Sequence, residues 1–346
     1  MEYQVTIEPS GHRFTVAQGE SVLAGALRAG LVIPYSCRGG SCATCMGKVV
    51  EGEVTYPGGG TPEALDETEA AIGQALFCMA QPGSDLVIEV RELRDAGDIE
   101  PRKLPCRVVA MHRLAHDVMQ LDLKLPDSER LQFLPGQYID ILLRDGRRRS
   151  YSLANPPHRD DFLEIHVRHL VDGEFSGKVF GSMREKALLR LDGPYGTFFL
   201  REESERPILM MGGGTGLAPL QSMLEHAFEI GLNRPIHLYW GVRARNDLYR
   251  HEQLAIWAAK YPHFTYTPCL SEPLPEDQWQ GRIGLVHNML LQEHPQLGGY
   301  DVYMSGPPGM IEAARRDFRH HGLLDEHLYF DSFEHAADNM IAPPEN

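Results

Sequence analysis

The sequence predicts a multidomain protein of mixed α+β and α/β class, in which three segments follow one another along the chain. With 346 residues, the chain is longer than a single hydrophobic core usually holds. Residues 103–200 form short alternating β-type runs with turn signals roughly every ten residues, which indicates an antiparallel barrel or sandwich. Residues 205–334 alternate strand-like and helix-like runs, which indicates an open parallel α/β sheet.

Charge and hydropathy argue against several classes of partner. The formal net charge of −15 argues against nucleic acid and against anionic membrane surfaces. The apolar runs are far shorter than the roughly 20 residues of a membrane-spanning helix. The first residues lack the basic, apolar and small-residue pattern of a signal peptide. We therefore expect a cytoplasmic protein that neither spans a membrane nor binds nucleic acid.

The first segment, residues 1–92, begins with two alternating runs around a Ser-Gly-His turn, which predict a β-hairpin from residue 3 onward. A helix is expected near residues 20–29, and Gly30 is its predicted stop. The polar stretch after this segment predicts a linker at residues 93–102. At the other end of the chain, we expect a loose tail over 335–346.

Four cysteines of this first segment have the spacing of a metal centre. Four residues separate Cys37 from Cys42, two separate Cys42 from Cys45, and Cys78 follows after 32 more, which is the plant-type pattern for a [2Fe–2S] cluster. Such a cluster is anionic, so its loop must bring backbone N–H groups close to the sulfurs. The small residues of the loop allow that approach: Gly39, Gly40, Ser41 and Ala43.

Two alternatives remain for these cysteines, a zinc site and a disulfide pair. Zinc ribbons with four cysteines prefer two pairs, each spaced two residues apart, which this sequence lacks. Clustered cysteines without an export signal favour metal or redox chemistry over disulfides. The other two cysteines, Cys106 and Cys269, lie in apolar strand-like runs and are expected to fill cores.

On these residues, the first segment resembles the plant-type ferredoxin module. The resemblance covers residues 3–92 and implies a β-grasp fold. It also implies that the cluster ligands are Cys37, Cys42, Cys45 and Cys78.

The middle segment contains "RRRSYSLAN", in which Arg149, Tyr151 and Ser152 follow the order Arg-x-Tyr-Ser. Alternate residues of a strand point to one face. Arg149 could therefore meet a phosphate, Tyr151 a planar heterocycle, and Ser152 a polar group of that heterocycle. A solvated strand with a basic face is the alternative.

Three further motifs accompany this one: "FLPGQYIDI" (133–141), "HVRHLVDGEFS" (166–176) and "DGPYGTF" (192–198). Together the four resemble the flavin-binding β-barrel of the ferredoxin–NADP reductase superfamily. The resemblance implies bound FAD, although FMN occurs in a minority of relatives. It places the following residues at the flavin and its phosphates: Arg149, Tyr151, Ser152, His166, Val167, Arg168, Gly173, Phe175 and Ser176.

The last segment opens with "ILMMGGGTGLAPLQSML", a strand, a glycine-rich turn and a helix. Glycines let a pyrophosphate approach the backbone, and the N-terminus of the helix favours anions. A tight turn without a ligand is the alternative. With "VYMSGPPGMIEAA" (302–314), "WQGRIGLV" (279–286) and "YFDSF" (329–333), the segment resembles the nicotinamide-nucleotide module of the same superfamily.

This second resemblance assigns two groups of residues. Those at the nucleotide are Gly213, Gly214, Thr215, Gly216, Gly306, Pro307 and Phe333. Those at the site of hydride transfer are Ser152, Ser305 and Asp331, where Ser305 occupies a position at which relatives usually carry Cys.

The nucleotide itself is predicted from the stretch "RARNDLY". A 2′-phosphate requires fixed cations near the end of the strand that follows the glycine-rich helix. Arg243 and Arg245 stand there, but Asp247 is close enough in sequence to pair with either. We therefore expect Arg243 at the ribose of NADH rather than at the 2′-phosphate of NADPH.

The three segments cover nearly the whole chain and, in this order, resemble the reductase components of bacterial oxygenases. The resemblance implies that electrons run from NADH through FAD to the cluster and on to a partner protein, a sugar dehydrase or an oxygenase component. A flavin suits the middle position because it takes electron pairs and releases single electrons. We expect a monomer. The alternative functions are a relay subunit without its own NAD(P)H oxidation and a redox sensor.

Overall fold

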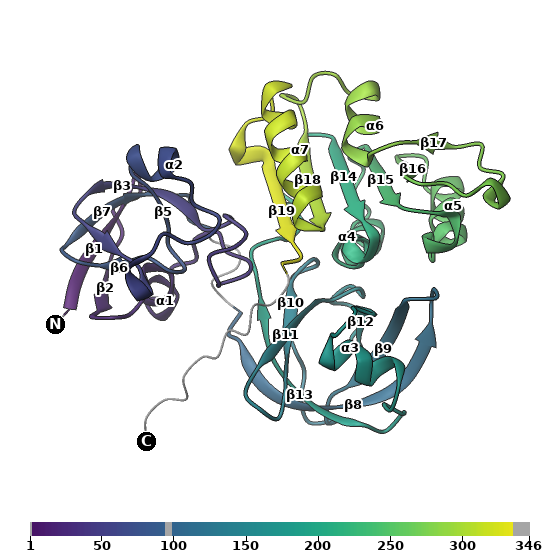
Figure 1. Ribbon diagram of the computed structural model, residues 1–346, viewed down its shortest axis with the longest axis horizontal. Coiled ribbons are helices and arrows are strands. Elements are labelled where there is room, and N and C mark those ends of the chain that lie inside the picture. Colours follow the sequence, from purple (N-terminus) through teal and green to yellow (C-terminus); the bar gives the residue numbers. More distant parts are fainter. Residues whose placement is uncertain (1, 94–98, 335–346) are drawn as a thin grey trace. The chain divides into compact units, whose positions relative to one another are not determined.

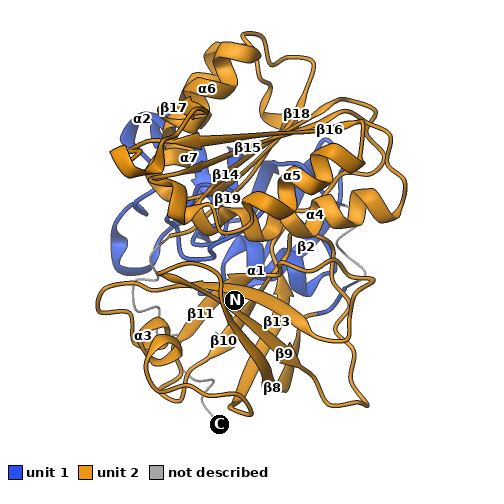
Figure 2. Ribbon diagram, turned by 90° about the vertical axis from the view of Figure 1, so that its right-hand side faces the viewer, with its two compact units in different colours: residues 1–100 blue, residues 101–346 orange. Residues whose placement is uncertain are grey.

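The computed structural model describes residues 2–93 and 99–334, so part of the predicted linker 93–102 and the whole predicted tail 335–346 lie outside the described residues. The chain forms two compact units, Met1–Glu100 and Pro101–Asn346 (Figure 2). The first unit contains the four clustered cysteines, and the second contains both predicted nucleotide-binding segments.

The first unit is built on a five-stranded mixed sheet of order β2-β1-β7-β3-β5. The predicted hairpin is β1 with β2, and β1 also pairs in parallel with β7. Apart from this sheet, β4 and β6 pair with each other as a short antiparallel ribbon. The strands are β1 (Glu2–Glu8), β2 (Arg13–Ala17), β3 (Met46–Glu51), β4 (Val54–Thr55), β5 (Gln74–Leu76), β6 (Gln81–Pro82) and β7 (Leu86–Glu89).

The predicted helix of this unit is α1 (Val22–Arg28), and a second short helix is α2 (Glu67–Ala71). Ser21 begins α1 because its hydroxyl accepts a hydrogen bond from the N–H of Ala24 at 3.2 Å. Gly30 follows the helix with a φ of 76°, as expected of a glycine stop. The hairpin, the helix and the parallel β1–β7 pair confirm the predicted α+β class.

The second unit begins with a six-stranded antiparallel barrel of order β11-β10-β13-β8-β9-β12. A bridge between Leu153 and Ile165 joins the two outer strands, so the barrel is favoured over the sandwich. Cys106 is buried in its core, as predicted. The elements are β8 (Arg102–Arg113), β9 (Val118–Lys124), β10 (Tyr138–Leu142), β11 (Arg148–Ser152), β12 (Leu163–Arg168), α3 (Glu174–Phe180) and β13 (Leu188–Tyr195).

The rest of the unit is the predicted open sheet, entirely parallel, of order β17-β16-β15-β14-β18-β19 (Figure 1). Its strands are β14 (Ile208–Gly213), β15 (Ile236–Val242), β16 (Phe264–Leu270), β17 (Arg282–Ile283), β18 (Asp301–Gly306) and β19 (Leu328–Ser332). Its helices are α4 (Leu217–Glu229), α5 (His251–Lys260), α6 (Val286–Glu293) and α7 (Pro308–His320).

The helices of this sheet divide between its two faces. Side chains of α4 and α5 share one hydrophobic core with the sheet, and side chains of α6 and α7 share another. The chain order reverses between β14 and β18, which are neighbours in the sheet although β15 to β17 lie between them in sequence. Ligands of such sheets bind at the carboxyl ends of the strands at this reversal. The fold therefore directs attention to the turns after Gly213 and Gly306.

Candidate functional site

Three of the predicted cluster ligands lie in one loop before β3 and the fourth, Cys78, follows β5; backbone N–H groups are aimed at their sulfurs. Three of the thiols are buried and that of Cys37 is half-buried. The N–H of Gly39 donates to Cys37 Sγ at 3.4 Å, and the N–H of Cys78 donates to Cys45 Sγ at 3.5 Å. The loop bends through left-handed backbone at Arg38, Gly40 and Ala43. The backbone thus offers the hydrogen bonds that an anionic sulfur site needs.

The thiols also meet in two pairs, Cys37 with Cys42 and Cys45 with Cys78. Contact with Cys42 lowers the pKa of Cys37 to about 5, and contact with Cys37, together with burial, raises the pKa of Cys42. Contact with Cys78, together with burial, likewise raises the pKa of Cys45. Four buried sulfurs so close together can all be thiolates only beside cations, and two pairs match the two irons of a [2Fe–2S] cluster. The residues therefore fit this group, which accepts one electron at a time.

The Arg-x-Tyr-Ser motif lies on β11. Arg148 is held by Asp140 at 3.3 Å and Asp192 at 2.8 Å, whereas Arg149 Nη1 donates to the carbonyl of Arg148 at 2.8 Å. The ring of Tyr151 packs against the ring of Phe175 with centroids 5.5 Å apart. Burial raises the pKa of Tyr151, so the phenol stays neutral. A flat, neutral ring at this strand fits a planar heterocycle.

The turn before α3 is the predicted phosphate site. Ser176 Oγ donates to the carbonyl of Gly173 at 3.1 Å and accepts from the N–H of Leu170 at 3.1 Å. A Cβ at Gly173 would lie 2.4 Å from Ser176 Oγ, so the tight turn requires glycine. The side chains of Phe175 and Val167 belong to the barrel core, so any contact of these two residues with a ligand is predicted to come from their backbone.

His166 and Arg168 face the nucleotide segment with their side chains. His166 Nδ1 lies 3.1 Å from the hydroxyl of Tyr249. Arg168 Nε donates to Asp117 at 2.7 Å, and its Nη1 lies 2.5 Å from where a Cβ of Gly214 would stand. The predicted flavin strand β12 therefore also contacts the predicted nucleotide turn.

Glycines of the nucleotide turn allow β14 and β18 to approach each other closely. A Cβ at Gly216 would lie 2.0 Å from the carbonyl oxygen of Ser305, and one at Gly306 would lie 3.0 Å from the backbone of Gly213. Thr215 is half-buried between these glycines. Packing alone thus explains part of the glycine pattern, and a pyrophosphate at this turn remains a prediction.

The three predicted catalytic residues come together where the barrel meets the parallel sheet. Ser152 Oγ donates to Asp331 Oδ2 at 3.2 Å. Asp331 pairs in register with Ser305 on the neighbouring strand. Ser305 is fully buried and, among the described residues, its hydroxyl has no hydrogen-bond partner. The N–H of Phe333 donates to the carbonyl of Gly306 at 2.9 Å, which holds the last predicted residue beside this group. An unpaired buried hydroxyl fits a site that a polar ligand completes.

The structure corrects one expectation about the nucleotide. Asp247 pairs with neither arginine: its carboxylate accepts from the N–H of Ala244 at 3.1 Å and lies 3.6 Å from His116. The backbone N–H of Arg245 donates to the carboxylate of Asp277 at 3.2 Å, and the guanidinium of Arg245 donates to the backbone carbonyl of Asp277 at 3.2 Å. The short turn Arg245–Asp247 directs the carboxylate of Asp247 back to the backbone of Ala244, the residue that precedes the turn. The closeness of Asp247 to the two arginines in sequence did not indicate this direction. Arg243 is exposed at the end of β15.

Sequence reasoning missed a polar network that joins the barrel to the nucleotide segment. Glu164 Oε1 lies 3.0 Å from His166 Nε2 and accepts from Arg250 at 3.1 Å and from Gln221 at 3.3 Å. Burial raises the pKa of Glu164, but the hydrogen bond to His166 and the charges of Arg250 and Arg159 outweigh it and leave the pKa at about 2. The residues that bond to Glu164 lie up to 86 positions away from it in the sequence, and no local motif indicates these bonds.

Comparison with known families matches all three segments. A 2Fe-2S iron-sulfur cluster binding domain matches residues 5–83. An oxidoreductase FAD-binding domain matches residues 105–200, and an oxidoreductase NAD-binding domain matches residues 210–316. The cofactors are therefore a [2Fe–2S] cluster, FAD and NAD(H), which confirms the prediction. No helix within residues 2–93 and 99–334 is long and apolar enough to cross a membrane.

Two characterised relatives are similar over nearly their whole lengths. CDP-6-deoxy-L-threo-D-glycero-4-hexulose-3-dehydrase reductase of Yersinia pestis is 36% identical over 96% of this chain and 99% of its own length. The order of the three segments in the sequence resembles that of CDP-6-deoxy-Δ3,4-glucoseen reductase, and the similarity to the Yersinia protein confirms this resemblance. The reductase component DmpP of phenol 2-monooxygenase from Pseudomonas sp. is 37% identical over 98% of this chain and 96% of its own length.

Among solved structures, the Amycolatopsis cytochrome P450 reductase GcoB is similar with a TM-score of 0.76 and 32% identity, covering 96% of this chain and 98% of that one. In such reductases electrons pass from NAD(P)H through FAD to the cluster. The chain therefore belongs to the ferredoxin–NADP reductase superfamily, among the iron–sulfur flavoprotein reductases that join 2Fe–2S, FAD-binding and NAD-binding domains, and it is an NADH-dependent oxidoreductase.

Proposed function

We propose that Ser152, Ser305 and Asp331 form the place where the nicotinamide and the flavin meet. The observation that carries this proposal is the hydrogen bond from Ser152 to Asp331, which joins the end of the flavin strand β11 to the last strand of the nucleotide sheet. FAD held there would supply the chemistry that takes up the electron pair of NADH and passes it on as single electrons.

The protein's own groups have distinct roles in this site. Asp331 accepts the hydroxyl proton of Ser152 and so fixes the orientation of this hydroxyl. The lone pairs of Ser152 Oγ are then held in one direction and can accept a hydrogen bond from the ligand. Ser305 offers an unpaired hydroxyl in a buried setting, where a single hydrogen bond counts for more than it does in water. Burial of all three residues keeps water away from the transferring hydride.

The test is anaerobic mixing of the purified holoenzyme with NADH while the flavin absorbance is followed. We expect the flavin to bleach before the cluster is reduced. If the flavin stays oxidised with NADH and with NADPH, the chain is a relay that receives its electrons from another protein.

We further propose that the acceptor is a separate protein, either a dehydrase acting on a nucleotide-linked sugar or an oxygenase component. The names of the relatives support both, since one serves a CDP-hexulose dehydrase and another a phenol monooxygenase. The chain would act as a cytoplasmic monomer. Reduction of each purified candidate acceptor with NADH, followed by sedimentation of the reductase alone, tests partner and oligomeric state separately.

A further inference from the structure

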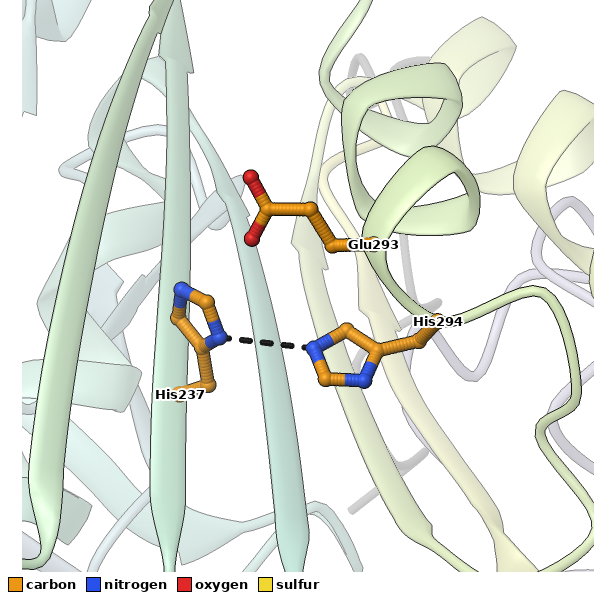
Figure 3. A group of neighbouring side chains, drawn as sticks. All are labelled: His237, Glu293 and His294. Carbon is orange, nitrogen blue, oxygen red and sulfur yellow. Dashed lines mark hydrogen bonds between the residues drawn. The ribbon is translucent and has the colours of Figure 1, made fainter.

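Three side chains converge on the face of the nucleotide sheet that α6 covers (Figure 3). His237 projects from the beginning of β15, and Glu293 and His294 come from the C-terminal end of α6. One ligand atom of each residue lies within 4.8 Å of the others. None of the three takes part in the predicted cluster, flavin or nucleotide sites.

The two imidazoles are oriented as metal ligands are. His237 Nδ1 and His294 Nε2 face each other at 3.4 Å. Two nitrogens bound at about 2.05 Å to a tetrahedral zinc ion lie about 3.3 Å apart. The same separation also lies at the long limit of a hydrogen bond, which Figure 3 draws as a dashed line. The two inner nitrogens are therefore spaced as they would be on one shared cation.

The outer nitrogen of each ring is held by a hydroxyl. His237 Nε2 lies 2.8 Å from Thr267 Oγ1, and His294 Nδ1 lies 3.2 Å from the hydroxyl of Tyr300. Such outer hydrogen bonds fix ring orientation in metal sites and leave the inner nitrogens free to bind.

The carboxylate is fixed as well. Glu293 Oε2 accepts from the hydroxyl of Tyr239 at 2.6 Å, and Oε1 pairs with Arg282. Each oxygen keeps a further lone pair for a cation. Two imidazoles and one carboxylate form a donor set typical of zinc, with a fourth position left for water.

We propose that His237, Glu293 and His294 bind one divalent cation with the coordination chemistry of Zn²⁺. The cation would tie the end of α6 to the sheet and would not touch the reacting groups. His237 lies four residues before Gly241 on β15, about 13 Å from the edge where the nucleotide turn lies. The role is therefore structural.

The first experiment uses the full holoprotein with its cluster assembled, freed of loose metal with a chelator and then equilibrated with Zn²⁺ alone. We expect about one equivalent of tightly held zinc. Zinc-edge X-ray absorption should show nitrogen and oxygen at about 2.0–2.1 Å, whereas sulfur at about 2.3 Å would place the zinc in the cysteine loop and overturn the proposal.

Two variants locate the ion. His294→Gln removes a ligand and should weaken zinc binding at least 100-fold. Tyr300→Phe keeps all three ligands but loosens one ring, so it should weaken binding about 10-fold to 100-fold. His320→Gln, an exposed histidine on α7, is the matched control and should bind as the unaltered protein does. Equal affinity in His294→Gln and the unaltered protein overturns the site.

Stability supplies a second readout that does not depend on activity. Zn²⁺ should raise the unfolding temperature of the unaltered protein and of His320→Gln, because it binds only the folded state. It should leave that of His294→Gln unchanged. No zinc retained at micromolar concentration, with no shift in unfolding temperature, would show that the three residues form a hydrogen-bonded cluster alone.

Discussion

Ser152 Oγ donates a hydrogen bond of 3.2 Å to Asp331 Oδ2, although 179 positions separate the two residues. Both side chains are buried. The bond connects the end of β11 in the barrel to β19 in the parallel sheet. A hydrogen bond to a carboxylate in such a setting contributes roughly 1.5–3 kcal/mol. Its loss should therefore be visible in the chemistry that takes place beside it.

Ser152→Ala tests this relationship directly. We expect the rate constant for flavin reduction by NADH to fall about 10-fold to 100-fold, which corresponds to the loss of one hydrogen bond to a charged group. Flavin content should stay near that of the unaltered protein. Stopped-flow absorbance measures the rate.

The matched control for this variant is Ser150→Ala on the same strand. The hydroxyl of Ser150 donates to Asp140 within the barrel at 2.7 Å and makes no contact with the nucleotide sheet among the described interactions. An equal loss of rate in both variants would attribute the effect to the barrel rather than to the Ser152–Asp331 bond.

Features set by local chemistry could be predicted from the sequence. A cluster requires four thiolates from one tight loop and a nearby strand, so the spacing of Cys37, Cys42, Cys45 and Cys78 identifies it. The strand, glycine turn and helix at Gly213–Gly216 likewise follow from period and turn chemistry. Each signal lies within a short stretch of chain.

Features set by packing between distant segments could not be predicted. The bonds of Glu164 to Arg250 and of Ser152 to Asp331 depend on how the barrel meets the parallel sheet, which no local pattern records. The predicted partner of Asp247 was wrong because a single turn redirects its carboxylate onto backbone. Sequence distance is a poor guide where a local turn decides the direction of a side chain.

Cys78→Ser should remove or destabilise the cluster while leaving flavin reduction by NADH nearly intact. Cys78 lies in the first compact unit, whereas the flavin motif lies in the second. Ferricyanide reduction should survive and cytochrome c reduction should fall, as steady-state assays with each acceptor will show. Cys106→Ser, a buried cysteine of the barrel core, is the control that should keep the cluster. Loss of flavin from Cys78→Ser would contradict the independence of the two units.

Glu164→Gln should destabilise the second unit by about 3–5 kcal/mol, because it leaves Arg250 and its neighbours without their buried anion. The pKa of Glu164 in the folded protein, about 2, lies below its ordinary value of 4.5. The stability it contributes is therefore present above about pH 4.5 and is lost as the pH falls toward 2.

Urea unfolding of the unaltered protein and of Glu164→Gln at pH 7 and at pH 3 checks this prediction. The difference between them should shrink at the lower pH. Exposed Glu185→Gln is the control and should change little at either pH. A constant difference across this range would show that the charge of Glu164 is not what stabilises the unit.

An acidic surface of the first unit is expected to steer the acceptor protein. Residues 1–92 contain 12 Asp and Glu but only 5 Lys and Arg. We expect the docking charges in the stretch after the cysteine loop, residues 51–69. Two acidic residues of this stretch serve another purpose, since Asp66 and Glu69 cap α2 by binding each other's backbone N–H. The other acidic residues of the stretch are exposed, namely Glu51, Glu53, Glu63 and Glu67.

Partner-coupled turnover should therefore fall several-fold as salt rises from about 0.02 M to 0.2 M, since screening shortens the reach of these charges. The double variant Glu51→Lys/Glu53→Lys should lose turnover at low salt and show a weaker salt dependence. Glu185→Lys in the barrel is the control. A coupled rate that ignores salt, while flavin reduction by NADH stays normal, would argue for docking through uncharged surface.

The preference for NADH is expected to hold although Asp247 does not neutralise either arginine. Arg243 and Arg245 are both exposed after β15, and the guanidinium of Arg245 donates to the backbone carbonyl of Asp277 rather than to its carboxylate. Each exposed ion pair contributes only about 0.2–1 kcal/mol, or less than about sixfold in affinity. That is too little for either arginine alone to make NADPH the favoured donor. We expect kcat/KM with ferricyanide to be higher for NADH, and Arg243→Ala to lower the value for NADPH more than that for NADH. A tenfold preference for NADPH, about 1.4 kcal/mol of transition-state binding, would instead mean that further cations gather around the 2′-phosphate.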